Sequence, residues 1–220
     1  MKTILAAGLL FFAMSLLHSK EVEVLAPGWG ELKYELDPAG SYELPRLYPA
    51  SNGEILLSSG EKAQLTEVFG GKISVLTFIY RRCSDVNGCP LATFVLHSLQ
   101  KSLFEHEDFE NKVRFISMSF DPVNDTPNVM KSYAEDFSQK DGYEWIFATT
   151  ESKNKLNPIL EAYGQYTFEV EGENGKSDFA HILRAFLIDT EGQVRNIYSV
   201  DFLHPKILLA DIKTLLLEHS

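Results

Sequence analysis

From residue 73 onward, the chain alternates between continuous apolar runs and segments in which apolar residues recur every three or four positions. Such runs are typical of buried strands, and the recurring positions are typical of helices with one buried face. The predicted strands are 73–80, 113–120, 143–149, 183–189 and 193–200, and the predicted helices are 90–107, 152–163, one opening at Thr126-Pro127 and one from Pro205. This alternation, which ends in a β-hairpin and a helix, predicts an α/β sandwich of thioredoxin type: a central mixed β-sheet flanked by helices.

The segments outside this alternation have a different composition. Residues 20–52 are rich in Pro, Gly and aromatic residues and are predicted to form an irregular N-terminal extension. Residues 53–67 suggest a short β-hairpin followed by a small helical turn, and residues 165–178 a polar connection. We therefore expect one domain over residues 53–220, preceded by the extension.

Residues 1–19 have the pattern of a targeting segment. Lys2 is followed by an uncharged, mostly apolar stretch from Ile4 to Leu17, which is short for a membrane span and suits a secretory signal peptide. The cleavage site is poor because Leu17 is large, so an uncleaved membrane tether is the alternative. Either reading places the protein outside the cytoplasm, in the periplasm, as a soluble protein or one tethered to the inner membrane.

Charge excludes one class of partner. The formal net charge is −11 and no basic run is present, so nucleic acid is not an expected partner. The acidity is ordinary for a soluble exported protein, and it would also steer docking to a basic protein surface.

The two cysteines of the chain, Cys83 and Cys89, lie between a predicted strand and a predicted helix. Pro90 suits a first helical turn, which places Cys89 at the helix start, where free N–H groups and the helix dipole favour a thiolate. Arg81 and Arg82 add positive charge next to Cys83. The pattern predicts two activated sulfurs, suited to a soft metal or to redox exchange.

A structural disulfide is the alternative, since two cysteines in an exported protein often form one. A bridge across so short a loop would contribute only about 2 kcal/mol, and a chain of this length can build its own core. The turn signal Asn87-Gly88 would bring Cys83 towards Cys89 in either case.

A second polar cluster follows the strand 113–120. Asp121-Pro122 is predicted to form a turn, and Asp125 or Thr126 to cap the next helix. The alternative for the two aspartates is a partner-docking pair or a weak second metal site.

Taken together, the motifs resemble the Sco/SenC family of exported, thioredoxin-like copper proteins. The resemblance rests on four blocks in order: Leu76-Thr-Phe-Ile-Tyr…Cys83…Cys89-Pro90, Ser119-Phe-Asp-Pro-Val-Asn-Asp-Thr-Pro127, Trp145-Ile-Phe147 and His181-Ile-Leu-Arg-Ala-Phe-Leu-Ile-Asp189. It implies that one copper ion binds through Cys83, Cys89 and His181. Two thiolates and an imidazole favour Cu(I), with Cu(II) as the alternative. This loop has five residues between the cysteines, whereas the usual family loop has three.

The resemblance also implies a function. A family member is expected to be a metallochaperone that assists assembly of the dinuclear copper site of a respiratory oxidase subunit, or of a similar exported cuproprotein, by ligand exchange. The alternatives are a thiol–disulfide oxidoreductase with Cys83 and Cys89 as its catalytic pair and a thiol reductant as partner, or a copper or redox sensor. His181 distinguishes them, because a metal site needs it and dithiol exchange does not.

Overall fold

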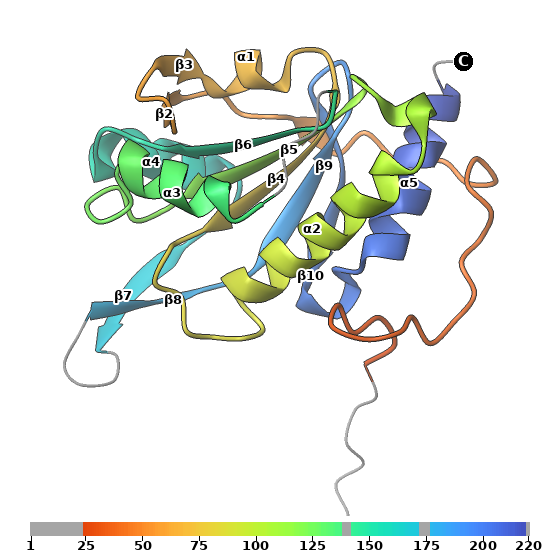
Figure 1. Cartoon of the computed structure of the whole chain (residues 1–220), viewed down its shortest axis with the longest axis horizontal. Helices are drawn as coiled ribbons and strands as arrows, with labels where there is room; N and C mark the ends of the chain where they lie inside the picture. The colour runs from red at the N-terminus through yellow and green to blue at the C-terminus, as the bar shows by residue number, and fades with distance from the viewer. Residues whose placement is uncertain (1–23, 138–141, 172–176, 219–220) are drawn as a thin grey trace, which may run out of the picture.

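A computed structural model of the chain describes residues 24–137, 142–171 and 177–218 (Figure 1). The expected targeting segment, residues 1–19, lies outside these ranges. Within them, no helix combines the length and the apolar character needed to cross a bilayer.

A mixed β-sheet forms the centre of the described structure. Its strands, in spatial order, are β1 (Tyr48–Pro49), β10 (Gln193–Ser199), β9 (Arg184–Ile188), β4 (Ile73–Ile79), β5 (Val113–Ser119), β6 (Glu144–Thr149), β2 (Glu54–Leu57) and β3 (Lys62–Gln64). β4, β5 and β6 run parallel, and β9 pairs antiparallel with β4. The predicted mixed sheet is confirmed. The extension is not wholly irregular, because β1 joins the sheet edge beside β10.

Helices cover both faces of the sheet. They are α1 (Leu65–Phe69), α2 (Cys89–Phe104), α3 (Pro127–Glu135), α4 (Lys153–Ala162) and α5 (Pro205–Glu218). α2 packs against α5, and its Thr93 hydroxyl lies 2.9 Å from the Tyr133 hydroxyl of α3, so these three helices share one face. Tyr163, at the end of α4, packs on Phe78 and Phe186 of the opposite face.

The core explains the strongest sequence patterns. β4 is covered on both faces and is buried at every position, which is why its sequence, apolar except for Ser74 and Thr77, shows no alternation. On α2, the four-residue repeat of Leu91, Val95, Leu99 and Leu103 is buried, as predicted. The strand end and the helix start that flank the cysteine loop are therefore anchored in the core.

The segment predicted as a polar connection is instead a β-hairpin. β7 (Thr167–Glu171) and β8 (Ser177–His181) pair antiparallel as a separate two-stranded sheet, which projects away from the central sheet (Figure 1). β7 is exposed along most of its length, including Phe168 at 66%. No face of this strand is buried, so its sequence lacks the pattern that identifies a core strand.

Candidate metal centre

The two cysteines lie where the sequence places them, between the end of β4 and the start of α2. Gly88 is the N-cap and Cys89 the first residue of α2. Cys89 is buried, with 2% of its surface exposed, whereas Cys83 is partly exposed. Both are free thiols, so the structural disulfide is not formed in this structure.

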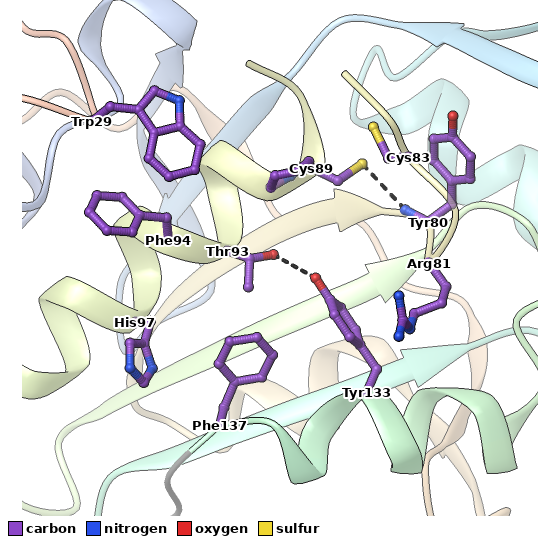
Figure 2. A pocket seen from close by; sticks show the side chains of 11 residues that line it. Trp29, Tyr80, Arg81, Cys83, Cys89, Thr93, Phe94, His97, Tyr133 and Phe137 are labelled. Carbon is purple, nitrogen blue, oxygen red and sulfur yellow. Dashed lines mark hydrogen bonds between the residues drawn. The ribbon is translucent and has the colours of Figure 1, made fainter. Parts of the chain in front are cut away.

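The two cysteines shift each other's pKa in opposite directions. The neighbouring Cys89 side chain is the main cause that lowers the pKa of Cys83 to about 6. The Cys83 side chain, followed by burial, raises the pKa of Cys89 well above its ordinary value. The backbone N–H of Tyr80 donates to the Cys89 sulfur at 3.4 Å (Figure 2). The pKa shifts therefore favour the thiolate at Cys83 and not, as expected, at Cys89, because Cys83 and burial together outweigh the helix dipole there.

A tight turn inside the loop brings Cys83 back to Cys89. The Gly88 N–H donates to the Asp85 carbonyl at 2.9 Å, and the Asn87 N–H donates to the Asp85 carboxylate at 3.0 Å. This turn takes up the five-residue spacing, as the Asn-Gly signal predicts. A Cβ at position 88 would lie 3.1 Å from the Cys83 sulfur, so a larger residue there would require the Cys83 side chain to shift by a few tenths of an ångström.

His181 reaches the same site from the end of β8. Its Nε2 lies 3.9 Å from the Cys89 sulfur, across 92 residues of sequence. The ring packs against Phe120 at a centroid distance of 4.7 Å and against Tyr80 at 6.3 Å. Burial lowers the pKa of the imidazole, which favours the neutral form that binds metal ions.

Tyr80 connects the hairpin to the cysteine loop. Its hydroxyl donates a hydrogen bond to the Asp178 carboxylate of β8, and its ring packs edge-on against Phe179 at 5.3 Å. Burial, followed by the bond to Asp178, raises the pKa of Tyr80. Sequence reasoning missed this role, because Tyr80 ends a predicted strand and carries no motif for a partner on β8.

The two arginines beside Cys83 have partners of their own. The Arg81 guanidinium lies over the Tyr133 ring at 5.2 Å, and Arg82 Nη2 lies 3.5 Å from an oxygen of Asp121. The low pKa of Cys83 arises mainly from the Cys89 thiol. The arginines therefore matter less to the sulfurs than the sequence suggests.

An aromatic pocket of about 390 Å³ opens beside the sulfurs (Figure 2). It is lined by Trp29, Tyr80, Arg81, Cys83, Cys89, Pro90, Thr93, Phe94, His97, Tyr133 and Phe137. Trp29 comes from the N-terminal extension and stacks on Phe94 of α2 at 4.6 Å. Part of the wall beside the cysteines is therefore built by a segment that sequence reasoning assigned no role.

The donor atoms fit a soft metal ion, although they are not yet gathered around one. Among the described residues, no group of three or more His, Cys, Asp or Glu side chains is assembled in a metal-holding arrangement. Two donors bound at about 2.0 and 2.3 Å, as zinc binds imidazole and thiolate, lie about 3.7 Å apart at trigonal angles. The 3.9 Å between Cys89 and His181 is close to that value, and Cys83, whose pKa responds mainly to Cys89, lies on the same loop.

A thioredoxin-like fold that carries two thiols and a neutral imidazole at one end defines a thiol protein of the redox or metal-carrying class. The particular family follows from comparison with known sequences: the model of the SCO1/SenC family matches residues 55–217. This chain belongs to the SCO1/SenC family.

Individual relatives agree with this assignment. The chain is 28% identical over 133 residues to the SCO1 protein homolog of Bacillus subtilis (strain 168), a match that covers 60% of this chain and 65% of that protein. The structure of Bradyrhizobium japonicum ScoI with copper bound superposes with a TM-score of 0.63 at 22% identity, covering 76% of this chain and 99% of that one. BsSco, described with a disulfide switch as a member of the Sco family of cytochrome c oxidase assembly proteins, has a TM-score of 0.62 at 25% identity, covering 79% and 96%.

Proposed function

We propose that this protein is an exported copper metallochaperone, which binds one copper ion through Cys83, Cys89 and His181 and transfers it to the copper site of a respiratory oxidase subunit or a similar cuproprotein. The observation that carries the proposal is the 3.9 Å approach of His181 to Cys89, because dithiol chemistry alone gives no reason for it. The copper-bound relative and the oxidase-assembly relative support the same reading.

The donor set favours Cu(I) as the cargo. Thiolates are soft ligands, and two of them with a neutral imidazole suit a soft ion in three-coordination. Both cysteines must be deprotonated to bind, so copper displaces the proton that Cys89 retains in the metal-free protein. A thiol reductant outside the cytoplasm is needed to keep the pair available.

Transfer proceeds by ligand exchange in an order set by exposure. Cys83 is partly exposed and Cys89 is buried, so a partner thiolate reaches the copper most easily on the Cys83 side. Each incoming partner ligand replaces one ligand of this protein, and the leaving thiolate recovers a proton from water. Copper keeps its oxidation state throughout.

A second candidate function is thiol–disulfide exchange. It is favoured by the Cys83 pKa of about 6, which makes this thiol an attacking nucleophile near neutral pH. The Cys83 thiolate would attack a partner disulfide, and Cys89 would resolve the mixed disulfide, leaving a Cys83–Cys89 bridge here and two thiols on the partner. The raised pKa of Cys89 makes that second step slow.

Titration of the reduced protein with Cu(I), in competition with a chelator and without oxygen, tests the proposal. The wild type should bind one equivalent, and Cys83→Ser and Cys89→Ser should each lose tight binding. His106→Ala is the matched control, because His106 is exposed just beyond the far end of α2. Unchanged stoichiometry and affinity in Cys83→Ser would rule out the site.

A further inference from the structure

The cysteine loop begins with a β-turn whose second residue directs its backbone N–H at a buried carboxylate. The Cys83 N–H donates to the Tyr80 carbonyl at 3.3 Å, which closes the turn Tyr80-Arg81-Arg82-Cys83. The hydrogen bond that closes such a turn does not involve the N–H of its second residue, so this N–H needs an acceptor outside the turn. Here the Arg81 N–H donates to Asp125 Oδ2 at 2.9 Å.

Asp125 reaches this turn because β4 and β5 end side by side. The Phe120 N–H donates to the Ile79 carbonyl at 2.9 Å, so the loops that leave the two strands start as neighbours. The Asp125 N–H then donates to the Asp121 carbonyl at 2.8 Å, which confirms the predicted turn and folds residue 125 back under Arg81.

The Asp125 carboxylate does not cap the helix that follows it. Thr126 is the N-cap residue of α3, and its side chain makes no capping hydrogen bond. Besides Arg81, the Asp125 carboxylate accepts a hydrogen bond from the Ser119 hydroxyl at 2.6 Å. The prediction that Asp125 or Thr126 caps α3 is therefore confirmed in position at Thr126, although the cap makes no side-chain hydrogen bond.

Burial of the Asp125 carboxylate costs free energy, which its hydrogen bonds must offset. Asp125 is 1% exposed, and desolvation raises the pKa of its carboxyl group against the two hydrogen bonds that lower it. A buried carboxylate is destabilising unless its hydrogen bonds are satisfied. Asp121, also 1% exposed, lies beside Arg82, the other central residue of the turn. Both central residues of the turn are thus held by buried aspartates.

We propose that Asp125 is a positioning residue for the cysteine pair: by holding the Arg81 N–H, its carboxylate fixes the turn that keeps the Cys83 sulfur beside Cys89. The inference deepens the proposed copper function, but its direct consequence concerns the two thiols and needs no copper. Without this anchor the turn is free to open, and the effective concentration of one sulfur at the other falls.

Two variants separate position from charge. Asp125→Ala removes the acceptor, whereas Asp125→Asn keeps it, because both bonds fall on Oδ2 and an amide oxygen at that position can accept from Arg81 and from Ser119. Losing a hydrogen bond to a carboxylate should lower the equilibrium constant for Cys83–Cys89 disulfide formation in a glutathione buffer about tenfold in the Ala variant. Cu(I) affinity should fall by a similar factor, and the Asn variant should recover most of both.

Asp211→Ala is the matched control. Asp211 is a buried carboxylate of α5 that accepts hydrogen bonds from Tyr42, Asn196 and Tyr198. Its removal should lower stability and leave the disulfide equilibrium unchanged. In the wild type, amide hydrogen exchange should show the Arg81 N–H strongly protected, a measurement that needs no variant to fold.

The outcomes are distinct. An unchanged disulfide equilibrium in Asp125→Ala, an equal loss in Asp211→Ala, or an Arg81 amide that exchanges at the unprotected rate would each overturn the positioning role. If the wild type binds no copper while Asp125→Ala still shifts the disulfide equilibrium, only the proposed copper function fails.

Discussion

The cysteine loop and the β7–β8 hairpin meet at one site but differ in how they are stabilised. The loop joins β4, which is buried throughout, to α2, whose apolar face lies in the core. The hairpin is a sheet of its own, with Phe168 and Val170 exposed at 66% and 43%. Its strand β8 contacts Tyr80, at the start of the loop, and Phe120, just after β5.

This difference assigns different roles to the three donors. A two-stranded hairpin is marginally stable alone, so the position of His181 depends on a few side-chain contacts. The sulfur pair depends on the whole core. The two cysteines are therefore held by a stable part of the fold, whereas the third donor, His181, belongs to the less stable β7–β8 hairpin. Metal binding should stabilise that hairpin by mass action.

The largest expected effect tests whether the two regions differ in stability. Leu76→Ala, in the centre of β4, should lower the free energy of unfolding by about 2–5 kcal/mol, because it leaves a cavity in the core. Phe168→Ala on β7 should change it by about 0.5 kcal/mol or less. Urea unfolding of the two variants measures both, and similar losses would contradict the contrast.

His181→Ala tests whether the hairpin supplies a copper ligand. Loss of a group next to a ligand typically weakens a metal site about 10- to 100-fold, so loss of a ligand should weaken Cu(I) binding about 100-fold or more. Disulfide formation between Cys83 and Cys89 should persist, because their loop is anchored in the core. Chelator competition and a glutathione redox titration on the same variant give the two answers. Wild-type copper affinity in His181→Ala would contradict the proposed copper site and favour thiol–disulfide exchange as the function.

The pH dependence of alkylation tests the asymmetry within the loop. With a pKa of about 6, Cys83 is mostly thiolate at pH 7, whereas an ordinary thiol of pKa about 8.5 is about 3% thiolate, a difference of about 30-fold. Because the folded-state pKa is lowered, this group stabilises the fold above its ordinary pKa, and the stabilisation is lost as the pH falls through about 6. Iodoacetamide rates measured against pH should therefore show a midpoint near 6.

Cys89→Ala is the control for that measurement. It removes the thiol that is the main cause of the low pKa, so the midpoint for Cys83 should rise towards the ordinary value. A midpoint that stays near 6 in this variant would show that a group other than Cys89 lowers the pKa of Cys83.

The smallest effect concerns the contact between the two regions. Tyr80→Phe removes the hydroxyl that bonds Asp178 but keeps the ring and the backbone N–H that faces Cys89. Copper affinity should fall about three- to tenfold, the value of one hydrogen bond, with the disulfide equilibrium unchanged. Tyr163→Phe, which loses a hydroxyl bond to the Ser51 carbonyl, is the control and should leave copper affinity as it is.

Elements with a simple burial pattern could be predicted from the sequence alone. β4 and α2 were predictable because a strand covered on both faces and a helix with one buried face leave local patterns. Those two elements place Cys83 and Cys89 on one loop, and the turn at Asn87-Gly88 follows from residue types alone. His181 was identified only through resemblance to a family, because nothing local separates it from other histidines.

How these parts meet, and which sulfur has the lower pKa, depends instead on the tertiary structure. The exposed strand β7 has no periodic pattern of buried residues, so the pairing of β7 with β8 could not be predicted from the sequence. The pKa shifts favour a thiolate at Cys83 over Cys89, because each pKa depends on the neighbouring sulfur and on burial, and not only on the place of the residue in a helix. Asp125 bonds Arg81 because two parallel strands end side by side. Local periodicity reports burial within one element, whereas contacts across 40 to 90 residues depend on how the sheet aligns the ends of its strands.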